Sequence, residues 1–161
     1  WPYEWSGELL LSRGDLGSVL RMLTGGPGPD DGRWNLWLRG TGHEGSSEGS
    51  GTIWIEADQG RQMPILGEVF PPRHGAPSSV RGELVLGVRK GAVQILKIAL
   101  ESGAERAIGY GEILPGGWVE VDLLWTQGNG RPSAHRIRID GKAGSLRVEV
   151  LRPVWRAAGG P

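Results

Sequence analysis

Two carboxylates, Glu120 and Asp122, lie two residues apart in the run Trp118 to Trp125, in which apolar and polar residues alternate. If this run is a β-strand, both side chains project from the same face, because successive side chains point to opposite faces of a sheet. Paired carboxylates on one face can divide the nucleophile and acid roles of glycoside hydrolysis. Without a catalytic partner, they can still bind an ion or a hydroxyl group.

Tryptophan is the unusual resource of this chain, which carries eight of them. Alternation along the predicted strands places Trp34 and Trp125 with aliphatic residues, whereas Trp37, Trp54 and Trp118 fall with polar ones. Exposed aromatic rings stack on sugars or anchor a protein partner. The alternative is that both sheet faces are covered, by another sheet, a helix or a neighbouring subunit. We therefore predict that ligand binding involves Trp37, Trp54, Trp118, Glu120 and Asp122.

Other chemistries find little support in the sequence. His43, His74 and His135 lie far apart, without the short spacing of a local metal site. There is no cysteine, and therefore no thiolate nucleophile or Cys-based metal site. The surroundings of His135 do not resemble Gly-x-Ser-x-Gly, and the glycine-rich run has no Gly-Lys-Ser/Thr of a phosphate loop. We expect no catalytic residues, no metal and no cofactor.

Length and charge restrict the architecture and the partners. The 161 residues, 17.3 kDa, suffice for one domain with one core, which we expect to span residues 1–161. Eighteen basic and eighteen acidic residues give no net charge, so the field that attracts nucleic acid or an anionic membrane is missing. No apolar run could insert in a membrane. The start at Trp1 suggests that a leader or anchor was removed, or that the chain was trimmed.

The dominant pattern is that of an all-β protein. With 29 glycines and 11 prolines, the chain favours short strands joined by tight turns. Strands are predicted around residues 34–38, 52–56, 84–88 and 118–125. A hairpin is predicted from the strands 136–140 and 145–150, joined through Asp140-Gly141-Lys142-Ala143-Gly144.

Two segments also fit a helical stripe. Leu16, Val19, Leu20 and Leu23 predict a short helix over residues 16–23, for which Asp15 would be the N-cap. In that case the tripeptide at residues 13–15, Arg-Gly-Asp, which resembles integrin-binding loops, is a turn. Residues 92–100 fit either a helix or a strand that follows 84–88, and we favour the strand.

Two further stretches are predicted to be irregular. Residues 40–51 contain no apolar anchor, which predicts a mobile loop between two strands. Residues 70–79 contain three prolines, which places them outside any central strand.

Residues 82–142 resemble the laminin-G and concanavalin-A-like jelly-roll families. The resemblance rests on residues 82–95, which match a strand, turn and strand pair, on Gly116-Gly117-Trp118-Val119-Glu120-Val121, and on Ile137-Arg138-Ile139-Asp140-Gly141-Lys142. It implies an antiparallel β-sandwich. Where these families usually place histidine after the tryptophan, this chain has Val119. The resemblance extends to the Glu-x-Asp-x-x-Glu motif of the concanavalin-like glycosidases, which this chain matches at Glu120 and Asp122. The third acid of the motif is replaced by Trp125, so no enzymatic activity is expected.

We accordingly predict a non-catalytic, exported β-sandwich module, extracellular or on the cell surface, that binds carbohydrate or a partner protein. The alternative is a structural subunit of an extracellular filament or capsid, such as a pilin-like head or a jelly roll. In that case the N-terminal aromatic residues or Val154-Trp155 would dock on a neighbour in a homo-oligomer. A small hydrolase that uses Glu120 and Asp122 is a third, weaker hypothesis.

Overall fold

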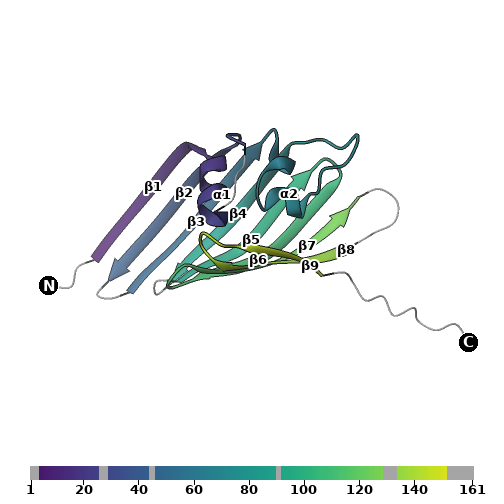
Figure 1. Ribbon diagram of the computed structural model, residues 1–161. Helices are drawn as coiled ribbons and strands as arrows, with labels where there is room; N and C mark the ends of the chain where they lie inside the picture. The colour runs from purple at the N-terminus through teal and green to yellow at the C-terminus, as the bar shows by residue number, and fades with distance from the viewer. Residues whose placement is uncertain (1–3, 26–28, 44–45, 90–91, 129–133, 152–161) are drawn as a thin grey trace, which may run out of the picture.

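The computed structural model describes residues 4–25, 29–43, 46–89, 92–128 and 134–151. These residues form a nine-stranded antiparallel sheet in which the strands neighbour one another in chain order (Figure 1). The all-β prediction is therefore confirmed. The strands are β1 (Glu4–Asp15), β2 (Arg33–His43), β3 (Ser46–Ala57), β4 (Val80–Arg89), β5 (Ala92–Ser102), β6 (Glu105–Leu114), β7 (Trp118–Gln127), β8 (Ala134–Lys142) and β9 (Arg147–Leu151).

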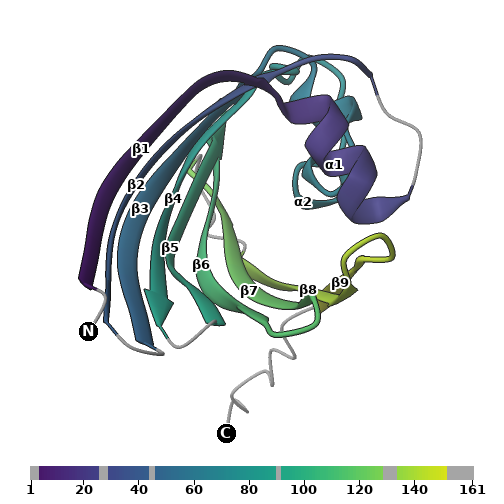
Figure 2. The same ribbon diagram turned by 90° about the vertical axis from the view of Figure 1, so that its left-hand side faces the viewer.

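The sheet curves into a deep arc, and its helices lie on the inner side (Figure 2). They are α1 (Leu16–Thr24), the 3-10 helix η1 (Gly60–Gln62) and α2 (Leu66–Val69). The described residues thus form one sheet, where a sandwich of two sheets was expected. Alternation in the sequence specifies that each strand buries one face, but it does not specify what covers that face. Here the curvature of the sheet, together with α1 and α2, covers the concave face.

The core lies between the concave face and the helices. Alternate residues of β7, namely Val119, Val121, Leu123 and Trp125, are all buried, as their spacing predicts. Phe70, next to α2, is fully buried. The remaining core residues are Leu16, Leu20, Ala57, Met63, Ile65, Leu66, Val69, Val80, Leu86, Ile95, Ile98, Leu100, Ala107, Ile137 and Ile139.

Helix α1 occupies the predicted position and has clear ends. Asp15 is its N-cap and accepts a hydrogen bond from the backbone N–H of Ser18 at 3.2 Å. The helix ends at Gly25, whose positive φ of 69° is the left-handed conformation that glycine favours. Close to this end, the backbone N–H of Gly144 donates to the carbonyl of Leu23 at 2.8 Å. The helix therefore reaches from the end of β1 to the turn between β8 and β9.

A buried ion pair holds the segment around α2 against the sheet. Arg61 is 3% exposed and its guanidinium lies 3.2 Å from the carboxylate of Glu105, at the start of β6. Arg61 Nε also donates to the hydroxyl of Ser102 at 2.9 Å and to the carbonyl of Pro77 at 2.7 Å. These partners compensate the desolvation of a buried guanidinium, which would otherwise be costly.

The prediction of a loop over residues 40–51 is wrong for most of these residues, which belong to strands. Gly40–His43 end β2 and Ser46–Gly51 begin β3, with Gly40 opposite Gly49. Glycine and serine have low strand propensity, but β1 and β4 pair with the outer sides of these strands, and this pairing overrides it. Residues 44–45 lie outside the described residues.

The other local predictions agree with the structure. Residues 92–100 belong to strand β5, and the hairpin of β8 and β9 forms where it was expected. Residues 70–79 contain no strand.

Candidate functional site

Strand β1 is an edge of the sheet, since within the described residues it pairs with β2 alone. Almost all of its twelve residues are exposed. Three of them are the consecutive leucines Leu9, Leu10 and Leu11, which are 47%, 69% and 41% exposed. An edge strand presents unpaired backbone N–H and C=O groups, and proteins usually blunt such edges with charge, proline or a cover. This edge is long, and charged residues near its ends, such as Glu4 and Arg13, leave the three leucines exposed in its middle.

The concave side of this edge carries an apolar groove of about 390 Å³. It lies between Trp5 and Leu9 of β1, Leu38 of β2 and Val88 of β4. Glycine makes room for the indole of Trp5: a Cβ on Gly42 would lie 1.9 Å from Trp5 Nε1. The indole of Trp5 can therefore approach the backbone of β2 only because a side chain is missing there.

The convex side of the same edge carries Leu10 between the polar residues Glu8 and Ser12. Leu10 lies opposite Trp37 of β2, and Asn35, two residues before Trp37, lies opposite Trp54 of β3. Trp37 donates its indole N–H to the carboxylate of Glu8. Trp54 is 44% exposed. Two of the predicted ligand-binding tryptophans therefore stand beside the β1 edge, on the outer face that strand alternation assigned to them.

A β-bulge ends the regular part of the edge. The pairing of β1 with β2 shifts between Leu11 and Gly14. Arg13 has a positive φ of 59°, and its backbone N–H donates to the side-chain oxygen of Asn35 at 3.1 Å. A bulge increases local twist and bends the strand. The part of β1 that is free to pair with another strand therefore runs from its first residues to Leu11 and Ser12.

The three other predicted site residues form a separate group on β7. Trp118 is 44% exposed and donates its indole N–H to Glu120 at 3.2 Å. Asp122 accepts a hydrogen bond from Arg136 at 3.0 Å, and this bond, with the aspartate charge, raises the pKa of the arginine above its usual value. Since β3 and β7 are four strands apart, about 19 Å at the usual strand spacing, the structure does not join this group to Trp54.

The group on β7 borders a shallow depression of about 420 Å³ on the convex face. It is lined by Tyr110, which is 62% exposed, and by Glu112, Glu120 and Asp122. Glu112 and Glu120 lie directly opposite each other on neighbouring strands. An aromatic ring beside several carboxylates is a combination that suits sugar hydroxyls.

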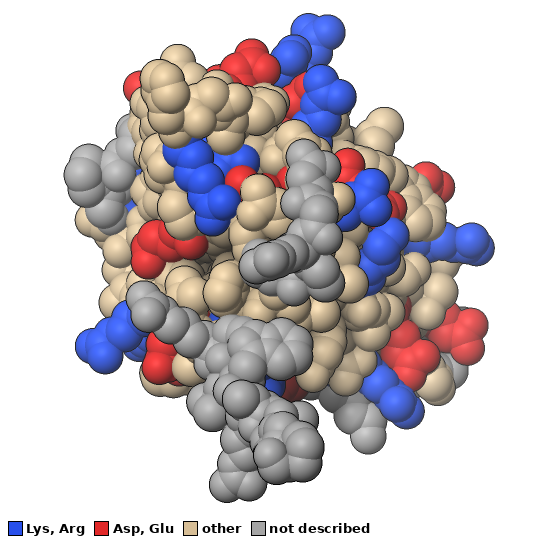
Figure 3. Space-filling view, turned by 90° about the vertical axis from the view of Figure 1, so that its right-hand side faces the viewer, with Lys and Arg blue, Asp and Glu red and all other residues tan. Residues whose placement is uncertain are grey.

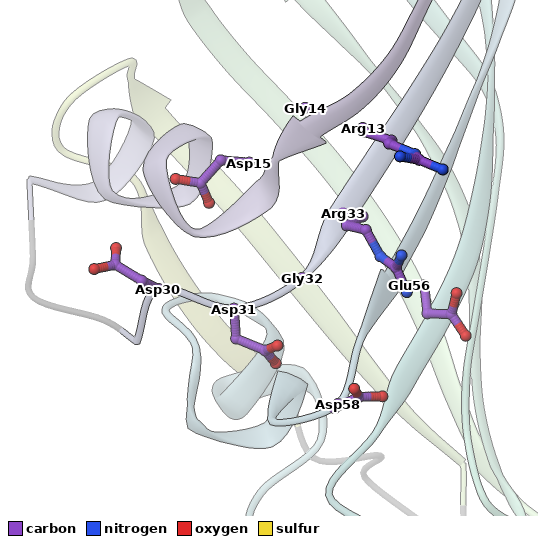
Figure 4. A pocket seen from close by; sticks show the side chains of 9 residues that line it. All are labelled: Arg13, Gly14, Asp15, Asp30, Asp31, Gly32, Arg33, Glu56 and Asp58. Carbon is purple, nitrogen blue, oxygen red and sulfur yellow. The ribbon is translucent and has the colours of Figure 1, made fainter.

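A third hollow, of about 530 Å³, lies at the other end of β1 and is lined by five acidic residues together with Arg13 and Arg33 (Figure 4). The carboxylates are spread along it rather than directed at one point. Several already have structural tasks: Asp15 caps α1, Asp30 pairs with Arg21 at 2.5 Å, and Asp31 accepts from the backbone N–H of Gln59 at 2.6 Å. The aspartate of the Arg-Gly-Asp tripeptide at residues 13–15 is therefore the N-cap of α1.

The histidines do not meet. His135 stacks on Trp125, with ring centroids 5.4 Å apart, while His43 and His74 are exposed elsewhere. Among the described residues, no group of three or more histidine or acidic side chains could hold a metal ion.

The comparisons with known proteins identify no relative. No family model matches the sequence, and no curated protein and no solved structure matches it. In the described part of the chain, no helix is long and apolar enough to cross a membrane. Basic and acidic side chains are interspersed on the face shown in Figure 3, with no gathering of one sign.

Sequence reasoning found the tryptophans beside the edge and missed the edge itself. The signal was present: Trp5, Leu9 and Leu11 alternate with Glu8 and Leu10 just before the predicted helix. Read as a strand, this segment has apolar residues on both faces. That pattern is unusual for a strand with solvent on either side.

Proposed function

We propose that this protein is a non-catalytic, exported binding module that recognises a partner protein by adding one of the partner's strands to β1. The observation that carries the proposal is the exposed, apolar edge of β1, with Leu10 on one face and Leu9 and Leu11 on the other. In strand addition, backbone hydrogen bonds supply affinity and pockets for alternate side chains supply specificity.

Both faces of the edge suit such a guest strand. Its inward side chains would lie against Leu9 and Leu11, next to the apolar groove. Its outward side chains would lie against Leu10. Burial of the exposed leucines would contribute hydrophobic free energy to the contact.

The test is a selection of random dodecapeptides displayed on phage against the wild-type protein. Binding of the selected peptides is then measured for Leu10→Lys, which places a charge on the edge, and for Leu96→Lys. Leu96 is a matched control because it is 58% exposed but lies on β5, which has a neighbour on each side. We expect Leu10→Lys to abolish binding and Leu96→Lys to retain it. Equal binding by both variants would contradict the proposal.

A second candidate function is carbohydrate binding at the depression on β7. The observation that favours it is the exposed ring of Tyr110 beside Glu112 and Glu120, with Trp118 hydrogen-bonded to Glu120. A titration with chitin, cellulose and mannose oligosaccharides would then change tryptophan fluorescence in the wild type and in Trp54→Ala. The change would be lost in Trp118→Ala. An unchanged response in Trp118→Ala would exclude this site.

A further inference from the structure

We infer that the partner strand at β1 is supplied by a second copy of this chain, an inference that rests on the proposed function. The two β1 strands would pair antiparallel about a two-fold axis through Leu10. An interface of this kind uses the same surface on both copies, so the surface must complement itself.

The side chains of β1 satisfy this condition in one register. With Leu10 opposite its own copy, Leu9 of one protomer lies beside Leu11 of the other. Both point to the concave face, so the two sheets join without reversing their faces. A shift of one residue would place Leu9 beside Leu10, with one side chain pointing inward and the other outward.

The charges near the edge complement each other in this register. Glu8 falls opposite the bulge formed by Ser12 and Arg13 of the second copy, and the arrangement occurs twice by symmetry. Within the part of the chain that is described, neither Glu8 nor Arg13 has an ion-pair partner. Both face the convex side: Glu8 accepts from Trp37 of β2, and Arg13 lines one hollow with Trp54 and another with acidic residues. On pairing, each side chain would turn from the neighbouring strands toward the edge.

The bulge also limits the pairing. Beyond Ser12 the strand leaves the regular register, so the paired segment is centred on residues 8–12. Such a short strand contact is stabilised chiefly by the leucines on its two faces. It therefore predicts a reversible dimer that depends on protein concentration, rather than a permanent one.

The experiment is sedimentation velocity over a hundredfold concentration range. The wild type is expected to pass from monomer to dimer. Leu10→Lys, which opposes two lysines on the axis, should remain monomeric, and Leu96→Lys should behave as the wild type. A wild-type monomer at every concentration, or a dimer that survives Leu10→Lys, would overturn the inference.

Charge reversal tests the register. Glu8→Arg and Arg13→Glu should each weaken the dimer about tenfold, because two exposed ion pairs are lost. The double variant should restore it, and failure to restore it would overturn the proposed pairing. A wild-type monomer that still binds selected peptides at β1 would leave the proposed function standing. A protein that neither dimerises nor binds selected peptides at β1 would contradict both this inference and the proposed function.

Discussion

Gly144, in the turn between β8 and β9, donates its backbone N–H to the carbonyl of Leu23 near the end of α1. Helix α1 follows directly on β1, so this bond links the first strand of the sheet to its last hairpin. The two edges of the arc are therefore bridged by a helix rather than by strand pairing (Figure 2). The bridge starts at the end of β1 and leaves the part of that strand before the bulge open.

The faces of the tryptophan-bearing strands lead to the first prediction. Trp125 is 3% exposed and packed in the core, so Trp125→Ala should lower the free energy of unfolding by about 3 to 5 kcal/mol. Trp37→Ala should cost much less in the isolated monomer, because Trp37 lies on the outer face. Urea unfolding of both variants measures the difference. Equal, large losses would show that the outer face is covered.

The buried ion pair leads to the second prediction. Arg61→Met should destabilise the fold by about 3 to 5 kcal/mol, because Glu105 would remain buried without its main partner. The control is Lys97→Met, which removes an exposed pair of 2.7 Å with Glu83 and should cost at most about 1 kcal/mol. Thermal and urea unfolding should rank the variants in this order. Similar losses would show that burial of the pair is unimportant.

The third prediction compares two glycines on the concave face. In Gly109→Ala the new Cβ would lie 1.9 Å from the carbonyl oxygen of Asp122 on the neighbouring strand. The strands would have to separate, at a cost of about 1 to 3 kcal/mol. A Cβ at Gly7 meets nothing within 4 Å, so Gly7→Ala should change stability by less than about 0.5 kcal/mol. Reversal of this order in urea unfolding would contradict the described close approach of β6 and β7.

The fourth prediction concerns pH. The side-chain hydrogen bond from Ser18, followed by that from its backbone N–H, lowers the pKa of Asp15 below the ordinary 3.8. A lowered carboxyl pKa means that the folded state favours the charged form, so this contribution is fully present above pH 3.8. It is lost as pH falls below that value, through the lowered pKa.

The variant Asp15→Asn tests this assignment, because asparagine is also a good N-cap but does not titrate in this range. Chemical-shift titration should show a depressed midpoint for the Asp15 carboxyl. The acid-dependent part of the unfolding free energy that comes from this residue should disappear in Asp15→Asn. A normal midpoint would show that the cap does not hold the carboxylate.

The sequence predicted those features that depend on local alternation and capping. The inward residues of β7, the helix after Asp15 and the hairpin of β8 and β9 are examples. It could not predict that one curved sheet would replace two flat ones. Whether strands stack or curl depends on twist accumulated over the whole sheet and on what α1 and α2 cover.

The same distinction applies to the site. Phase along a strand correctly placed Trp54 and Trp118 on the outer face. It could not show that they belong to separate places, since strand order decides which outward residues are neighbours. The prediction of a loop over residues 40–51 was wrong for a related reason. These residues are extended because the strands on either side pair with them.

Amide hydrogen exchange with and without a selected peptide tests most directly whether β1 is the binding edge. We expect slower exchange over residues 5–11 when the peptide is bound, with no change around Glu120 on β7. Protection confined to β7, or no protection at β1, would contradict it.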